Sequence, residues 1–126
     1  MTDTITIRIP ASTAHIGLIR ATASGLAARL DFTYDRITDL HIALDELCSR
    51  ILATSEPPPS QLEVAFELQG DGLRVTAKGD SPLKDGAAFL NPWSKMILES
   101  VTDGIDVAEG VAEATVVFRR GAGAPA

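Results

Sequence analysis

The chain has 126 residues, 45% of them hydrophobic and 22% charged, so its size and composition are those of one globular domain with no room for a second. A single cysteine, Cys48, rules out an intramolecular disulfide, and two histidines are too few for a zinc site built from cysteine and histidine. The net charge of −6 disfavours direct binding to nucleic acid or to anionic lipid, and favours a basic protein partner.

The start of the chain does not have the pattern of a targeting segment. Asp3 stands where a secretory signal peptide carries lysine or arginine, and no apolar run approaches the roughly 18 residues that span a bilayer. We therefore expect a cytoplasmic protein that does not bind a membrane.

The first half of the sequence predicts one strand and two helices. Residues 4–10 alternate isoleucine with polar residues, as a strand with one buried face does, and Pro10 ends the pattern. Residues 12–30 follow the N-cap hydroxyl of Ser12 with apolar residues every three or four positions, which predicts a helix. A stronger helical stripe covers residues 33–54 and is formed by Ile37, Leu40, Leu44, Leu47 and Ile51.

The second half predicts four strands and one helix. After a stiff connector of three prolines, residues 62–68 and 73–77 alternate as two strands, and the Gly70-Asp71-Gly72 sequence between them favours a hairpin. A long loop then covers residues 78–89, and a helix with proline in its first turn covers residues 92–101. Two last strands are expected at residues 104–108 and 111–119.

This order of elements predicts an α+β fold in two layers, with three helices on one face of a mixed, mostly antiparallel sheet. We expect a single domain over residues 1–120 and a disordered tail over residues 121–126.

The segment Asp39-Leu40-His41-Ile42-Ala43-Leu44-Asp45-Glu46-Leu47-Cys48-Ser49-Arg50 is the most informative part of the sequence. Glu46 and Arg50 lie one helical turn apart on a face about 100° from the leucine stripe, so both can point into a cleft. A simpler interpretation is an ion pair between them on a half-exposed helix face. Cys48 fits a small buried side chain without a redox role.

This helix resembles the D-L-x-x-A-x-D/S-E-x-C/V-x-N pattern of the anti-sigma-factor serine kinases that act in bacterial stress and sporulation switches. Those proteins share an ATPase fold with histidine kinases, gyrase and the heat-shock chaperone of 90 kDa. The stretch at residues 28–38 is also similar to the family's linker between its first two helices, and the variant at residues 45–50 looks most like divergent actinobacterial members. The resemblance implies that fold, and a homodimer contact through the first strand and first helix.

The resemblance also implies a role for several residues. Glu46 occupies the place of the family's catalytic base, whereas Arg50 replaces an asparagine that binds Mg²⁺, and a guanidinium has no lone pair to offer a metal. The adenine-binding Asp-x-Gly-x-Gly motif is replaced by a sequence in which Gly79 and Asp80 are the remaining candidates for nucleotide contacts. The glycine-rich phosphate loop is replaced by Asn91-Pro92-Trp93-Ser94-Lys95, where Pro92 lacks an N–H. We therefore predict no metal-ligating residue. ATP, alone or with Mg²⁺, is the candidate ligand, but the sequence does not establish a cofactor.

Three functions follow from the resemblance. The first is an anti-sigma factor that sequesters an RNA polymerase sigma subunit, with Arg20 of the first helix in the partner-binding surface and a degenerate nucleotide site. The second is an ATP-dependent serine kinase that phosphorylates an anti-sigma-factor antagonist. The third is an ATP-binding regulator without turnover, in which Arg50 holds the phosphates. Trp93 either anchors its helix to the sheet or, if it is exposed, contacts a partner.

Overall fold

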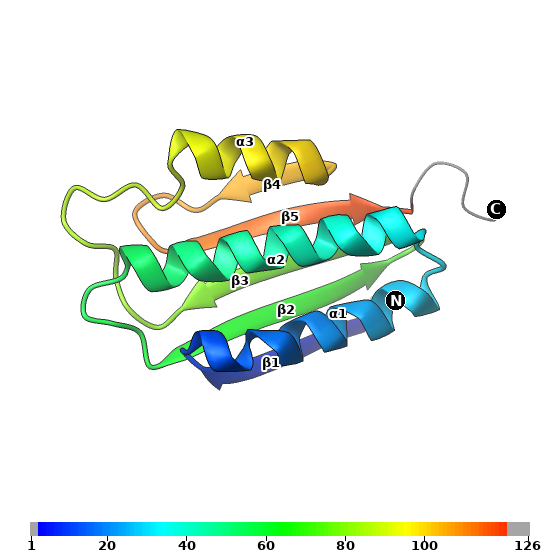
Figure 1. Ribbon diagram of the computed structural model, residues 1–126, viewed down its shortest axis with the longest axis horizontal. Helices are drawn as coiled ribbons and strands as arrows, with labels where there is room; N and C mark the ends of the chain where they lie inside the picture. The colour runs from blue at the N-terminus through cyan, green and yellow to red at the C-terminus, as the bar shows by residue number, and fades with distance from the viewer. Residues whose placement is uncertain (1–2, 121–126) are drawn as a thin grey trace.

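A computed structural model describes residues 3–120 as two layers, with helices on one face of a five-stranded sheet (Figure 1). The strands are β1 (Asp3–Pro10), β2 (Gln61–Gln69), β3 (Gly72–Gly79), β4 (Gly104–Val107) and β5 (Glu113–Arg119). The helices are α1 (Ile16–Arg29), α2 (Tyr34–Thr54) and α3 (Pro92–Val101), and a short 3₁₀ turn, η1 (Thr13–His15), leads into α1. The predicted α+β class is confirmed, and the predicted disordered tail lies outside the described residues.

The sheet has the order β1-β2-β3-β5-β4, and each of its four pairings is antiparallel. The sequence allowed for a mixed sheet, but among residues 3–120 no parallel pair occurs. The predicted hairpin joins β2 to β3 through the two residues Gly70 and Asp71, and Gly70 has a φ of 58°, which glycine adopts at little cost.

The core lies between the helices and one face of the sheet. Figure 1 shows α2 across the middle of the sheet, α1 beside β1 and β2, and α3 beside β4. The apolar stripe predicted for α2 is buried, and alternate residues of the inner strands face it; the largest fully buried side chains include Leu40, Leu44, Leu47, Ile51, Phe66, Val75 and Phe118. Alternation along β2, β3 and β5 therefore sets which side chains the helices cover.

Polar side chains fix where the helices begin. The hydroxyl of Ser12 caps η1, that of Thr33 caps α2, and the side chain of Asn91 caps α3 with Pro92 at its first position. The α3 boundaries agree with those predicted. No helix in the described part of the chain is long and apolar enough to cross a membrane.

Candidate functional site

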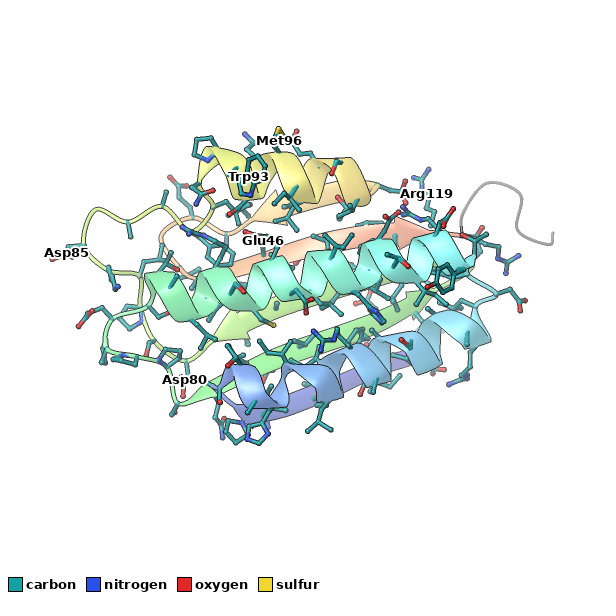
Figure 2. The ribbon with its side chains drawn as sticks, viewed as in Figure 1. Glu46, Asp80, Asp85, Trp93, Met96 and Arg119 are labelled. Carbon is teal, nitrogen blue, oxygen red and sulfur yellow. The ribbon has the colours of Figure 1, made fainter. Side chains whose placement is uncertain are left out.

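Glu46 lies on the side of α2 that faces α3, and its carboxylate is held there by a serine. The Ser94 hydroxyl donates a 2.6 Å hydrogen bond to Oε2 of Glu46. Ser94 is buried, and Figure 2 shows Glu46 between the two helices. The candidate base is thus engaged with a residue of its own chain.

The start of α3 explains how Ser94 reaches Glu46. The Asn91 side chain accepts a 2.7 Å hydrogen bond from the Ser94 N–H, which fixes the first turn of the helix. Ser94 shares its face with Leu98 and Val101, four and seven residues further along, and all three are buried. That spacing was a sequence signal for an inward-facing Ser94, and the Ser94–Glu46 contact is the part of the site that sequence reasoning missed.

Two of the first three residues of α3 offer no N–H to a phosphate. Pro92 has none and that of Ser94 binds the Asn91 side chain, while the Lys95 N–H makes the first bond of the helix itself, to the Asn91 carbonyl at 3.0 Å. A phosphate at a helix N-terminus needs several such groups pointing at it. This conformation therefore does not present the N–H cradle that a bound triphosphate requires.

Arg50 points at the loop before α3, because its guanidinium donates to two backbone carbonyls there. Nε lies 2.7 Å from the Phe89 oxygen and Nη2 lies 3.1 Å from the Ala88 oxygen. The simpler of the two interpretations, an ion pair with Glu46, was wrong, because none of the ion pairs in residues 3–120 joins these two side chains. The Phe89 side chain is itself buried in the core. The loop before α3 is therefore held both by Arg50 and by the packing of Phe89.

Backbone contacts also hold this loop against the end of α2. Ser55 and Leu83 form an isolated β-bridge, and the Lys84 N–H donates to the Thr54 carbonyl at 2.7 Å. The Glu56 N–H donates to the Pro82 carbonyl at 2.9 Å. The loop thus lies along the same end of α2 that carries Glu46 and Arg50, in the position where a nucleotide cleft was expected.

Gly79 and Asp80 lie away from Glu46 and have local structural roles. A Cβ on Gly79 would lie 2.6 Å from Cγ2 of Ile51 in α2, so glycine allows the close approach of β3 to that helix. The Asp80 carboxylate accepts hydrogen bonds from the Ser60 hydroxyl, the Ser60 N–H and the Gln61 N–H. The Ser60 hydroxyl is the main reason why the pKa of Asp80 lies below its usual range. Figure 2 shows Asp80 at the end of the sheet, well apart from Glu46.

Arg20 belongs to α1, which Figure 1 shows on the opposite side of α2 from α3, and it contacts α2. Its Nη1 lies 2.8 Å from Oδ1 of Asp45, and both side chains are nearly half exposed. One turn further along α1, Ser24 and His41 are joined by a 2.6 Å hydrogen bond. Arg20 therefore belongs to a second surface, separate from the Glu46 group.

Trp93 does not anchor α3 to the sheet, because 65% of it is exposed. Met96, one turn along, is 55% exposed. The sequence left open whether Trp93 anchors α3 to the sheet or is exposed, and in this structure it is exposed.

Neither the cysteine nor the acidic residues of the described chain form a reactive or metal-binding cluster. Burial raises the pKa of the Cys48 thiol to about 12, so the thiol stays protonated and unreactive. Among residues 3–120, no group of three histidine, cysteine, aspartate or glutamate side chains is placed to hold a metal ion.

Known proteins are similar to this chain both in sequence and in fold. No family model matches it. It is 37% identical over 83 residues to the serine-protein kinase RsbW of Bacillus subtilis, a match that covers 63% of this chain and 52% of that protein. It is 45% identical over 99 residues to the serine-protein kinase RsbW of Bacillus pumilus, covering 73% of this chain and 61% of that protein. The chain thus spans about half to three fifths of these relatives.

A solved structure supports the fold. The crystal structure of the RsbU and RsbW domains of Rv1364c from Mycobacterium tuberculosis superposes with a TM-score of 0.68 at 16% identity, over 92% of this chain and 31% of that one. The sequence matches and this fold agree with the resemblance carried by residues 39–50: the chain is a homologue of the RsbW serine-protein kinases.

Proposed function

We propose that the protein is a cytoplasmic anti-sigma factor, which binds an RNA polymerase sigma subunit without metal-dependent phosphoryl transfer. The observation that carries the proposal is the position of Arg50. It stands where the anti-sigma-factor serine kinases have a Mg²⁺-binding asparagine. Its guanidinium donates hydrogen bonds to the Phe89 and Ala88 carbonyls. Electrostatic stabilisation by the metal is a large part of phosphoryl-transfer catalysis, so its loss is expected to be severe.

The first-turn geometry of α3 supports the same proposal. Pro92 lacks an N–H and that of Ser94 is paired with the Asn91 side chain, so two of the first three residues of α3 offer no N–H to a phosphate. The acidic surface suits a sigma partner, because sigma factors expose basic DNA-contacting regions.

Calorimetric titration with ATP, with and without Mg²⁺, tests the nucleotide part of the proposal. We expect no affinity tighter than millimolar in either condition. A micromolar affinity that requires Mg²⁺ would contradict the proposal and favour an active kinase. Arg50→Asn restores the family's metal-binding residue type, and we expect it to raise any metal-dependent affinity, whereas Arg50→Lys keeps a cation there and serves as its control.

Capture of a sigma subunit tests the partner-binding surface. We expect Arg20→Ala to weaken capture at least tenfold, while Arg29→Ala, which removes an exposed arginine from the same helix, leaves it unchanged. Because Arg20 pairs with Asp45, the variant Asp45→Asn separates two roles. If Asp45→Asn lowers capture as much as Arg20→Ala, Arg20 acts through the helix seam; full capture by Arg20→Ala would refute the assignment.

The second candidate is an active serine kinase that phosphorylates an anti-sigma-factor antagonist. It is supported by the similarity to proteins called serine-protein kinases and by the Ser94–Glu46 hydrogen bond, since a general base accepts a hydrogen bond from a hydroxyl in the same way. Incubation with labelled ATP and an antagonist tests it: transfer to a serine that is lost in Glu46→Gln would establish the kinase.

The third candidate, ATP binding without turnover, has Arg50 as a cationic clamp on the phosphates. It predicts an affinity that does not depend on Mg²⁺ and is abolished in Arg50→Asn, the opposite of the result expected for a metal site.

A homodimer through β1 and α1 is also part of the proposal. One edge of β1 pairs with β2, and its other edge pairs with no strand of the described chain, so it can pair with a second copy. We expect Ile7→Lys, on the half-buried face of β1, to lower the mass measured by sedimentation equilibrium to that of one chain.

A further inference from the structure

The outer side of α3 carries a small apolar surface that nothing in the described chain covers. Trp93 and Met96 are the two exposed large apolar residues of this helix, at 65% and 55% exposure. Met96 also lines a shallow groove along the helix, with Pro92, Lys95, Glu99 and Ser100. Figure 2 shows Met96 on the side of α3 that points away from α2. We call this set, with Trp93, the α3 outer face.

Two opposite charges frame the groove. Lys95 and Glu99 are both exposed and lie four residues apart, one turn of the helix. Neither takes part in any ion pair or side-chain hydrogen bond of residues 3–120, including one between the two. The order lysine then glutamate is the less favourable one for such a pair within a helix. Both charges are therefore available to a group outside the chain.

A second copy of α3 in the opposite direction matches this arrangement. A two-fold axis near Met96 brings the two methionines together and places Lys95 of each copy within reach of Glu99 of the other, so two ion pairs form. Trp93 of each copy then covers the far end of the other groove. A groove with one charge of each sign offers no excess charge to a strongly basic or acidic partner, but it is complementary to itself.

We propose that the α3 outer face is a self-association surface, which binds the same face of a second copy in antiparallel orientation. It is distinct from the contact expected at β1 and α1, because β1 and β4, the strand beside α3, form opposite edges of the sheet. The two contacts together would join pairs into larger assemblies, and the α3 contact does not depend on sigma binding or on nucleotide.

The size of the surface limits its strength. Six side chains from each of two short helices bury well under the roughly 1,200 Å² of a stable specific interface. We therefore expect a dissociation constant on the order of 100 µM, which makes the contact weak at low concentration and measurable at high concentration.

Trp93 is the single tryptophan of the chain, so its fluorescence reports this surface directly. We expect its emission maximum to move to shorter wavelength as the protein concentration rises from about 5 to about 500 µM, with the mass from sedimentation equilibrium rising in parallel. An emission maximum that stays constant over this range would overturn the proposal, whatever the mass does, because association elsewhere leaves Trp93 exposed.

Charge exchange identifies the occupant as a second copy. Lys95→Glu and Glu99→Lys each place like charges against each other across the axis, so we expect each variant to lose the concentration-dependent shift. Mixed together they carry complementary faces, and the double variant K95E/E99K is again self-complementary, so both should regain it. Lys84→Glu and Glu109→Lys make the same charge changes at exposed positions outside α3 and should behave as the unmodified chain. A shift that survives in both single variants, or that neither mixing nor the double variant restores, would contradict the pairing.

Discussion

The two ends of α2 each carry an arginine that binds distant segments of the chain, but the two arginines do so with different chemistry. Arg36 lies in the first turn of α2 and Arg50 near its last, and both donate to backbone carbonyls of segments beyond residue 87. Arg36 also binds two carboxylates, at 3.0 Å to Asp39 and 2.5 Å to Asp103, and lies 5.1 Å from the ring centroid of Phe118. Among the described residues, Arg50 binds carbonyls alone.

This difference divides α3 into a firmly held end and a weakly held one. The C-terminal end of α3 and the end of β5 meet Arg36, whose side chain is only 16% exposed. The N-terminal end and the loop before it are held by hydrogen bonds from Arg50 to uncharged carbonyls and by the Ser94–Glu46 bond, each of which has one charged partner. The two Arg36–carboxylate bonds join opposite charges and add their Coulomb attraction, which the bonds at the other end lack, so local opening should begin at the end that carries the candidate site.

The largest expected effect is at the firmly held end. Arg36→Met keeps most of the side-chain volume but removes a guanidinium that donates to two carboxylates and two carbonyls, and leaves Asp103 with the Arg119 N–H as donor. We therefore expect the free energy of unfolding to fall by about 3 kcal/mol. Urea denaturation followed by circular dichroism measures it, with Arg29→Met as the control for loss of an exposed arginine. A fall in the free energy of unfolding no larger than that caused by Arg50→Met would contradict the difference between the two ends of α3.

Ser94→Ala should have the next largest effect. It leaves the half-buried Glu46 carboxylate without its hydroxyl donor, which we expect to cost about 1.5 kcal/mol. Ser100→Ala on the exposed side of the same helix is the matched control and should change little. Glu46→Gln in the Ser94→Ala background should recover part of the loss, because a neutral amide is cheaper to leave unpaired than a carboxylate; no recovery would mean that the Ser94 hydroxyl matters through packing.

Arg50→Met should cost about 1 kcal/mol in global stability and act mainly on the loop. We expect faster hydrogen exchange at the Lys84 and Ala87 amides, which the loop contacts protect, with unchanged exchange in β5. Equal acceleration at both ends of α3 would show that the helix opens as one unit, contrary to the difference between the two arginines.

Most of the fold follows from patterns within short stretches of sequence. The stripe of α2, the alternation of β2 and β3, and the Asn91-Pro92 start of α3 are each written in consecutive residues, and each was predicted within one or two residues. The direction of the outer pairings was less constrained, since strand periodicity does not state which neighbours a strand takes.

The site was less predictable because its contacts join residues far apart in sequence. Spacing placed Glu46 and Arg50 on one face of α2 and suggested that they pair, but Arg50 instead reaches carbonyls 38 and 39 residues away. Only the pair of Arg36 with Asp39 has a local spacing; its other partners lie 65 to 83 residues away and gave no local signal. Local spacing reveals which side chains share a helix face, whereas their partners depend on how loops pack.

The smallest expected effect concerns Asp80, at the start of the loop on the weakly held side. The Ser60 hydroxyl and nearby N–H groups lower the pKa of its carboxyl in the folded state. Its contribution to stability is therefore present above the unfolded-state pKa of about 3.9 and is lost as the pH falls through the lower folded value. Asp80→Asn, which has no charge to lose, should be slightly less stable at pH 7.

Below pH 4 that difference should shrink, because the unmodified protein loses this contribution as Asp80 is protonated while the variant does not. Urea unfolding at pH 7, 5 and 3.5 measures it, with Asp71→Asn in the exposed hairpin as the control for a missing carboxylate. Since Asp80 anchors the loop at Ser60 and Arg50 anchors it at Phe89, Asp80→Asn should also raise Lys84 exchange at pH 7 without altering β5. A stability difference that stays constant down to pH 3.5 would mean that the Asp80 charge contributes nothing and that its contacts are purely geometric.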